Sequence, residues 1–171
     1  MKNKLIAITA GVLILASGAF AKTVPDTLEN RVRHELVMLP YLTLFDDLSY
    51  RVDGTTVTLF GQVVDPVLKS DAAKVVKHVE GVTAVNDQVE VLPLSPMDNG
   101  IRWREYRAIY AYAPLQRYRM GVLPSIHIIV DNGHVTLKGV VGNAMDKQLA
   151  FMRANAVPGV FSVTNDLQVE K

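Results

Sequence analysis

The sequence lacks cysteine altogether, which excludes disulfide bonds, thiolate metal ligands and a cysteine nucleophile. It also lacks a charge excess, because 18 Lys and Arg residues against 17 Asp and Glu residues give a formal net charge of +1. This balance gives no indication of a nucleic-acid-binding protein. Hydrophobic residues make up 49% of the chain and charged residues 20%, which is typical of a globular protein rather than a disordered one.

A short apolar run near the N-terminus has the features of an export signal. Two lysines precede the run over residues 5–16, and Ala19-Phe20-Ala21 follows as a small-x-small cleavage site. We expect residues 1–21 to be a secretory signal peptide that is cleaved after Ala21. The alternative is an uncleaved membrane anchor, but the run is short for a span of about 20 residues. Since the cleavage site carries no cysteine, a lipid-anchored form is excluded.

The rest of the chain contains an internal repeat at an offset of 78 residues. One offset without a gap covers residues 48–91 and keeps both the apolar pattern and the glycines in register. The aligned pairs include Val57 with Val135, Leu59 with Leu137, Gly61 with Gly139 and Gly81 with Gly159. The sequence therefore predicts two structurally similar units.

Each copy predicts a helix, two strands, a second helix and a third strand. In the first copy, alternating apolar residues over 48–52 and 57–63 flank the turn Asp53-Gly54, and its counterpart is Asn132-Gly133. Asp65-Pro66 is typical of a helix start, and Asp26 with Glu29 predicts a capping box for the preceding helix. We expect an α+β fold with two tandem αββαβ units, each a small three-stranded mixed sheet with two helices on one face. Gly61 and Gly139 are expected to make room for a helix lying across the sheet.

The predicted boundaries are residues 26–92 for the first unit, 93–100 for a proline-stiffened linker and 101–171 for the second unit. Residues 26–95 carry 6 basic and 11 acidic side chains, whereas residues 96–171 carry 9 basic and 6 acidic side chains. Opposite charges favour a loose electrostatic association of the two units, unless apolar area adds to it.

The pattern of apolar and glycine positions resembles the BON domain, and it does so in both copies. The matching motifs are Val57-x-Leu59-x-Gly61-x-Val63 with Ala72-x3-Val76-x2-Val79-x-Gly81-Val82, and Gly133-x-Val135-x-Leu137-x-Gly139-x-Val141 with Ala150-x3-Ala154-x2-Val157-x-Gly159-Val160. Tandem BON domains behind a signal peptide are similar to osmotically inducible periplasmic proteins and related envelope proteins. The resemblance implies a periplasmic stress-response protein that binds phospholipid or envelope partners and has no catalytic activity. The matched positions specify packing, so the resemblance implies no particular ligand-binding residue.

The residues themselves offer no catalytic, cofactor-binding or metal-binding site. The four histidines have no metal-ligand spacing, and His127, between two isoleucines of a predicted strand, is expected on the solvated face. Asp46-Asp47 precedes the first strand, where backbone capping explains the acids. No nucleotide-binding or serine-hydrolase motif occurs, so we expect no enzyme, no cofactor and no small-molecule substrate.

One segment, residues 101–124, combines arginines and aromatic residues with Glu105 as its single acid. We expect it to bind anionic phospholipid headgroups, because several cations near an anionic surface give useful and reversible binding. The candidate residues are Arg102, Arg104, Arg107, Arg117, Tyr118 and Arg119. In the alternative interpretation the aromatic residues are core and the arginines are solvated or face the acidic first half. The protein would then be a soluble periplasmic adaptor or chaperone-like module with protein contacts alone.

Overall fold

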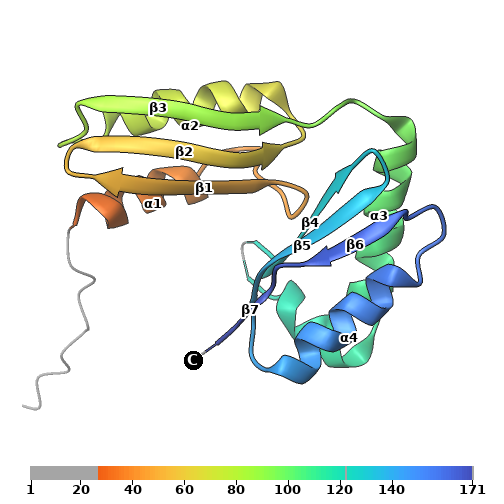
Figure 1. Ribbon diagram of the computed structural model, residues 1–171. Helices are drawn as coiled ribbons and strands as arrows, with labels where there is room; N and C mark the ends of the chain where they lie inside the picture. Colours follow the sequence, from red (N-terminus) through yellow and green to blue (C-terminus); the bar gives the residue numbers. More distant parts are fainter. Residues whose placement is uncertain (1–26, 122, 171) are drawn as a thin grey trace, which may run out of the picture.

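The computed structural model describes residues 27–121 and 123–170, so the predicted signal peptide lies outside the described residues. Two units follow one another along the chain, as the repeat predicts (Figure 1). The first consists of α1 (Leu28–Val37), β1 (Asp47–Asp53), β2 (Thr56–Val63), α2 (Pro66–His78) and β3 (Ala84–Val91). The second consists of α3 (Pro96–Tyr110), the 3₁₀ helix η1 (Ala113–Arg119), β4 (Ile126–Asp131), β5 (His134–Val141), α4 (Ala144–Asn155), β6 (Ser162–Asn165) and β7 (Gln168–Val169). The predicted α+β class and the two BON-like units are confirmed.

Both sheets are mixed, with equivalent pairing. In the first sheet β2 pairs antiparallel with β1 and parallel with β3, in the order β1-β2-β3. In the second sheet β5 pairs antiparallel with β4 and parallel with β6 and β7. The second sheet has four strands rather than the predicted three, because the last strand is interrupted after Asn165. The Asn165 side chain donates a hydrogen bond to the Lys147 carbonyl of α4 and accepts one from the Leu167 amide. These bonds hold the chain at the break between β6 and β7.

Each long helix begins at a side-chain cap. Asp65 accepts a hydrogen bond from the Val67 amide, as predicted, and Asn143 accepts one from the Asp146 amide. The cap of α1 is Thr27, whereas Asp26 of the predicted capping box lies outside the described residues. Ser95 caps α3 at Pro96, so this helix begins inside the stretch predicted as linker. Proline is suited to the first helical turn, where its missing N–H has no intrahelical partner.

Each unit buries one face of its sheet beneath two helices. In the first unit Leu59 of β2 packs with Leu68 and Val76 of α2, and all three are buried. In the second, Leu137 of β5 packs with Ile109 of α3. Figure 1 shows α1 and α2 behind the sheet of the first unit. This arrangement agrees with the prediction of two helices on one face.

The expected role of the two strand glycines is wrong, although both are structurally required. Gly61 and Gly139 each have φ +115°, a conformation that side-chain-bearing residues rarely adopt. A Cβ at Gly61 would overlap the backbone carbonyl of Asp47, and one at Gly139 would overlap that of Ser125. These glycines therefore admit the backbone of the neighbouring chain segment, not a helix.

The loop between α1 and β1 packs against the second unit. Phe45 belongs to the second unit's apolar core, where its ring meets Trp103 edge-on with ring centroids 5.2 Å apart. The Leu44 carbonyl accepts a hydrogen bond from the Ile128 amide of β4 at 2.8 Å. His127 of β4 contacts the Asp46 carbonyl at 2.6 Å, so the expectation that His127 is solvated is wrong. The loop thus covers the free edge of β4.

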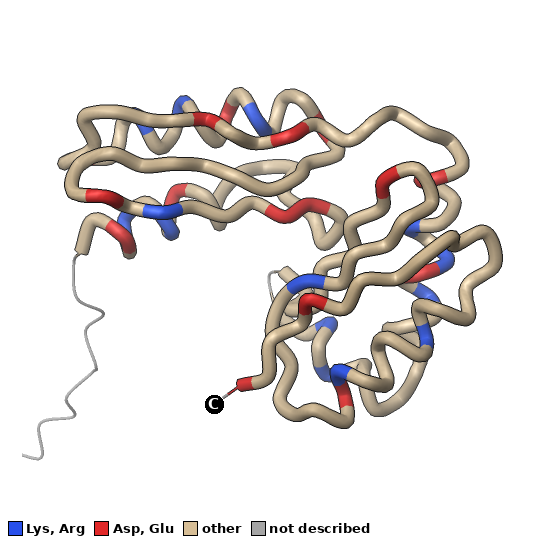
Figure 2. Tube along the Cα trace, viewed as in Figure 1, with Lys and Arg blue, Asp and Glu red and all other residues tan. Residues whose placement is uncertain are grey.

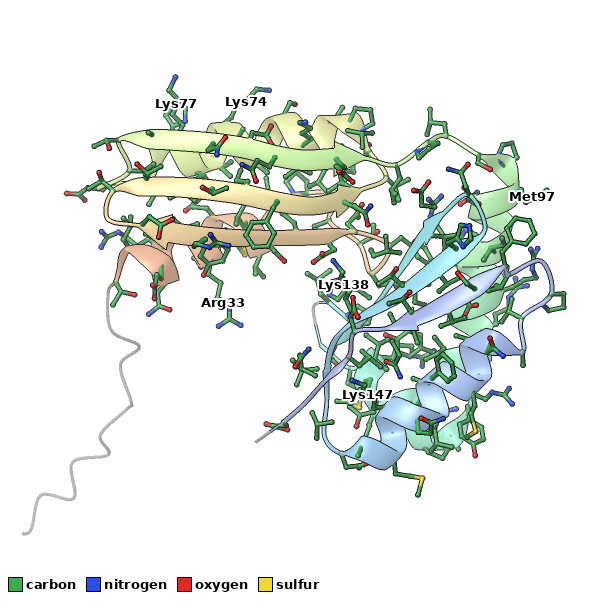
Figure 3. The ribbon with its side chains drawn as sticks, viewed as in Figure 1. Arg33, Lys74, Lys77, Met97, Lys138 and Lys147 are labelled. Carbon is green, nitrogen blue, oxygen red and sulfur yellow. The ribbon has the colours of Figure 1, made fainter. Side chains whose placement is uncertain are left out.

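Electrostatics contributes to the same contact. Lys138 of β5, labelled in Figure 3, donates to Asp47 with the Nζ and Oδ2 atoms 2.5 Å apart. The predicted attraction between the two halves is therefore present as an ion pair. It accompanies a buried phenyl ring, so apolar packing and charge act together.

Replacing Leu59 by Asp should destabilise the first unit by several kcal/mol, and Leu137→Asp should do the same to the second, because each buries an unpaired charge. Urea unfolding followed by circular dichroism measures the loss. The exposed positions Gln88 and Thr164 provide matched controls as Gln88→Asp and Thr164→Asp. Equal losses in the buried and exposed variants would contradict this core.

Phe45→Ala should separate the two units, because it removes the phenyl ring that the α1–β1 loop inserts into the second core, a loss of about 3–5 kcal/mol. X-ray scattering should report a larger radius of gyration for this variant. The wild type in 1 M salt should stay compact, since salt screens the ion pair and not the apolar contact. Phe161→Ala, at a ring that is 71% exposed, is the control. Separation of the wild type by salt alone would contradict an apolar contact.

Candidate functional site

The six predicted lipid-binding residues fall into three different environments, and Arg102 is removed from the surface. Arg102 is 2% exposed and donates to the Val130 carbonyl of β4 at 2.7 Å. Burial lowers its pKa, while the nearby carboxylates of Asp98, Asp46 and Asp131 act in the opposite direction. At 100° per residue this side chain lies on the inner side of α3, so the expectation of headgroup contact by Arg102 is wrong.

Arg117 and Tyr118, on η1, belong to a polar network at the start of α4. The Tyr118 hydroxyl donates to Asp146, accepts from the Gly142 amide at 2.8 Å and is almost fully buried. Arg117 forms a salt bridge with the same Asp146 carboxylate. Burial of Asp146 raises its pKa, but the hydrogen bonds from Tyr118 and Arg117 outweigh burial and hold the pKa below its ordinary value. The Asp146 carboxylate thus neutralises the charge of Arg117, and the Tyr118 side chain is buried. Arg119, the next residue of η1, is exposed.

Arg104 and Arg107 line a shallow hollow of about 260 Å³ between α3 and α4, together with Arg153 of α4. The remaining lining is apolar backbone and side chains: Ala108, Ala156, Val157 and Pro158. No acidic side chain lies among these lining residues. We call this feature the arginine hollow, and Figure 2 shows the basic residues along the helices of the second unit.

Two of the three guanidinium groups are held in place by backbone carbonyls. Arg104 donates from Nε to the Pro158 carbonyl at 3.2 Å, and Arg153 donates from Nε to the Ala108 carbonyl at 3.1 Å. Arg153 also lies over the Tyr112 ring, 5.0 Å from its centroid. Because only Nε is used in these bonds, the terminal nitrogens remain to bind a phosphate or carboxylate group.

Sequence reasoning missed Arg153, because this residue lies 46 positions after Arg107, in a helix whose other basic residue, Lys147, is six positions away. The αββαβ order of elements could have pointed to Arg153. That order brings the second helix of the unit beside the first, on the same side of the sheet.

Glu105 is the unusual residue beneath this surface. Its side chain is 0% exposed, and among the described residues neither carboxylate oxygen has a hydrogen-bond partner. Burial raises the pKa of Glu105 to about 8, and the positive charge of Arg104 opposes the rise only in part. The residue is therefore a neutral carboxylic acid near pH 7.

A second hollow, of about 560 Å³, lies beside the Arg117 network. Val140, Gly142 and Asn143 line it, along with Glu170 near the C-terminal end. Arg117 in this lining is already paired with Asp146, and Glu170 adds a negative charge. The surface of this hollow therefore has no net positive charge.

The described part of the chain contains no cluster of three or more His, Asp or Glu side chains placed to hold a metal ion. Across residues 27–121 and 123–170, none of the helices combines the length and the apolar character needed to cross a membrane.

Comparison with known proteins identifies relatives for both units. The BON domain family matches residues 26–93 and 119–171. Osmotically-inducible protein Y of Escherichia coli (strain K12) is 32% identical over 127 residues, which cover 72% of this chain and 62% of that protein. The chain thus spans less than two thirds of this relative's length. A solved C-terminal domain of CdsD, the structural protein of the type III secretion system of Chlamydia trachomatis, aligns with 85% of this chain and 98% of its own. Its identity is 12% and its TM-score 0.31, too low to support any conclusion.

Replacing Glu105 by Gln should change how stability depends on pH. The folded-state pKa of about 8 exceeds the ordinary value of 4.5, so the folded unit binds more protons than the unfolded chain between these values. The wild type should therefore lose stability as pH rises from about 4.5 to 8, by about 2–5 kcal/mol, and Glu105→Gln should not. Urea unfolding at pH 5, 6.5 and 8 measures the difference. Parallel pH profiles for the two proteins would contradict a buried neutral acid.

Proposed function

The chain belongs to the BON domain family, and from this premise we propose that it is a non-enzymatic envelope protein that binds anionic phospholipid headgroups through the arginine hollow. The single observation that carries the proposal is the convergence of Arg104, Arg107 and Arg153 in one concave surface without an acidic lining residue. Phosphate oxygens accept hydrogen bonds from guanidinium groups in a fork geometry, and three cations add their attraction to an anionic surface.

A periplasmic location and a part in osmotic or envelope stress protection belong to the same proposal. The predicted export signal over residues 1–21 supports the location. The similarity to a protein named as osmotically inducible supports the role in stress. The alternative is a soluble adaptor or chaperone-like module whose contacts are with proteins alone.

Membrane contact through this surface requires charge at the rim and access for a flat bilayer. Arg107 and Arg153 are exposed, on two adjacent helices, so both can reach a surface placed against α3 and α4. Trp103, one residue before Arg104 on α3, is half-exposed, and indole rings are favoured in the interfacial region of a bilayer. Arg119 and the paired Arg117 form a separate basic surface on η1.

Charge reversal in the hollow should strongly weaken binding to anionic vesicles. Each cation near an anionic surface contributes about 1 kcal/mol, so Arg107→Glu with Arg153→Glu should weaken binding by about 30-fold or more. The measurement is flotation of the mature protein with phosphatidylglycerol vesicles, compared with phosphatidylcholine vesicles. Circular dichroism checks that the double variant is folded.

Two matched double variants separate the possible surfaces. Lys74→Glu with Lys77→Glu reverses two exposed charges on α2 of the first unit (labelled in Figure 3) and should leave flotation unchanged. Arg117→Glu with Arg119→Glu tests the η1 surface directly and should have the smaller effect, since Asp146 already compensates Arg117. A wild type that never floats would favour the alternative with protein contacts alone.

A further inference from the structure

We propose that Glu105 carries a proton in the folded second unit and that this proton couples anion binding at the arginine hollow to pH. The inference rests on the proposed anion-binding function and adds a regulation of the same site. It arises from a buried acid whose carboxylate oxygens have no hydrogen-bond partner among residues 27–121 and 123–170.

The position of Glu105 on α3 forces it into the core. Ile101 lies one turn before it and Ile109 one turn after it, and both are fully buried. α3 packs against β4, α4 and η1, and the Glu105 side chain is 0% exposed. A carboxylate without a hydrogen bond in such surroundings is costly, and the neutral acid is the favoured form.

The same position brings the acid close to the arginine hollow. Arg104, the next residue toward the N-terminus, lines the hollow and is the positive charge that acts on Glu105. Ala108, one turn further along α3, also lines the hollow. Since Glu105 directly follows one lining residue and lies one turn from another, its charge state should change the potential at an anion placed in the hollow.

Several other titratable or charged groups lie on the elements that pack against α3. On α3 itself these are Asp98, Arg102, Arg104, Tyr106, Arg107 and Tyr110, and on β4, η1 and α4 they are His127, Asp131, Arg117, Tyr118, Arg119, Asp146, Lys147 and Arg153. The one imidazole in this set belongs to His127. Its contact is with the Asp46 carbonyl, at the boundary with the first unit.

Protonation of Glu105 leaves the three guanidinium charges of the hollow uncompensated. Ionisation would place a negative charge beside Arg104 and would weaken the attraction for an anion. By linkage, an anion bound in the hollow must raise the proton affinity of Glu105 by the same factor. Anion binding and proton binding should therefore favour each other.

The test is the affinity of the mature, full-length protein for sulfate at pH 6.0 and pH 9.0, measured by calorimetry at constant ionic strength. Sulfate keeps the same charge over this interval, so changes come from the protein. We expect wild-type affinity to be about fivefold higher at pH 6.0 than at pH 9.0, with proton uptake on binding at the higher pH. Glu105→Gln keeps the size of the side chain and removes the titration, so its affinity should be nearly equal at the two pH values.

Glu170→Gln, at an exposed acid, is the matched control and should retain the wild-type pH dependence. Equal pH dependence in the wild type and in Glu105→Gln would overturn the coupling and leave the anion site intact. Absence of sulfate binding at pH 6.0 would overturn the proposed function, and the coupling with it. As a measurement that needs no variant, a carbon-13 NMR titration of Glu105 should give a midpoint well above the ordinary range. A midpoint near 4.5 would overturn the inference.

Discussion

The packing of α3 against β4 is the contact on which the second unit and its surface chemistry depend. Ile101 and Ile109 supply the apolar part of this contact, and Arg102 supplies a hydrogen bond to the Val130 carbonyl. Asp98, in the first turn of the same helix, accepts hydrogen bonds from the Asn132 and Gly133 amides of the β4–β5 turn. Polar groups thus fix the rotation of α3 at one end, and apolar side chains bury its middle. That rotation determines that Glu105 faces inward while Arg104 and Arg107 face outward.

The contact between the two units follows from the same arrangement. An uncovered β4 would expose unpaired backbone groups along the edge of a short sheet, which invites association with other chains. The 44–46 segment covers this edge with one backbone hydrogen bond and the Phe45 ring. Asp46, itself buried, holds the segment in shape by accepting hydrogen bonds from the Thr43 and Val64 amides. The opposite charges of the two halves are represented in this contact by the ion pair between Lys138 and Asp47. The ion pair fixes the orientation of the contact, and the apolar packing of Phe45 remains its main part.

The duplication made most of the fold predictable, because repeated apolar spacing reports burial within a unit. The αββαβ order of elements, the Asn132-Gly133 turn and the Asp65 cap all follow from local patterns, and all are present. Contacts between units leave no such period, so neither the docking of Phe45 nor the half-buried state of His127 could be predicted. Arg102 and Arg104 are two residues apart on one helix, and their opposite environments follow from the rotation of α3. The rotation of α3 could not be read from the sequence, because arginines and apolar residues occur on both faces of this helix.

Counting arginines along the chain therefore overstates the charge that a ligand can meet. Arg102 is surrounded by acids inside the fold, and the charge of Arg117 is compensated by Asp146. Arg153, which lies outside the basic segment, joins Arg104 and Arg107 because two helices of one αββαβ unit lie side by side. Glu105 does not reduce the positive charge of α3 in this way, because its carboxyl group is neutral. The cationic surface is thus a property of helix packing and of one buried proton, more than of the local density of basic residues.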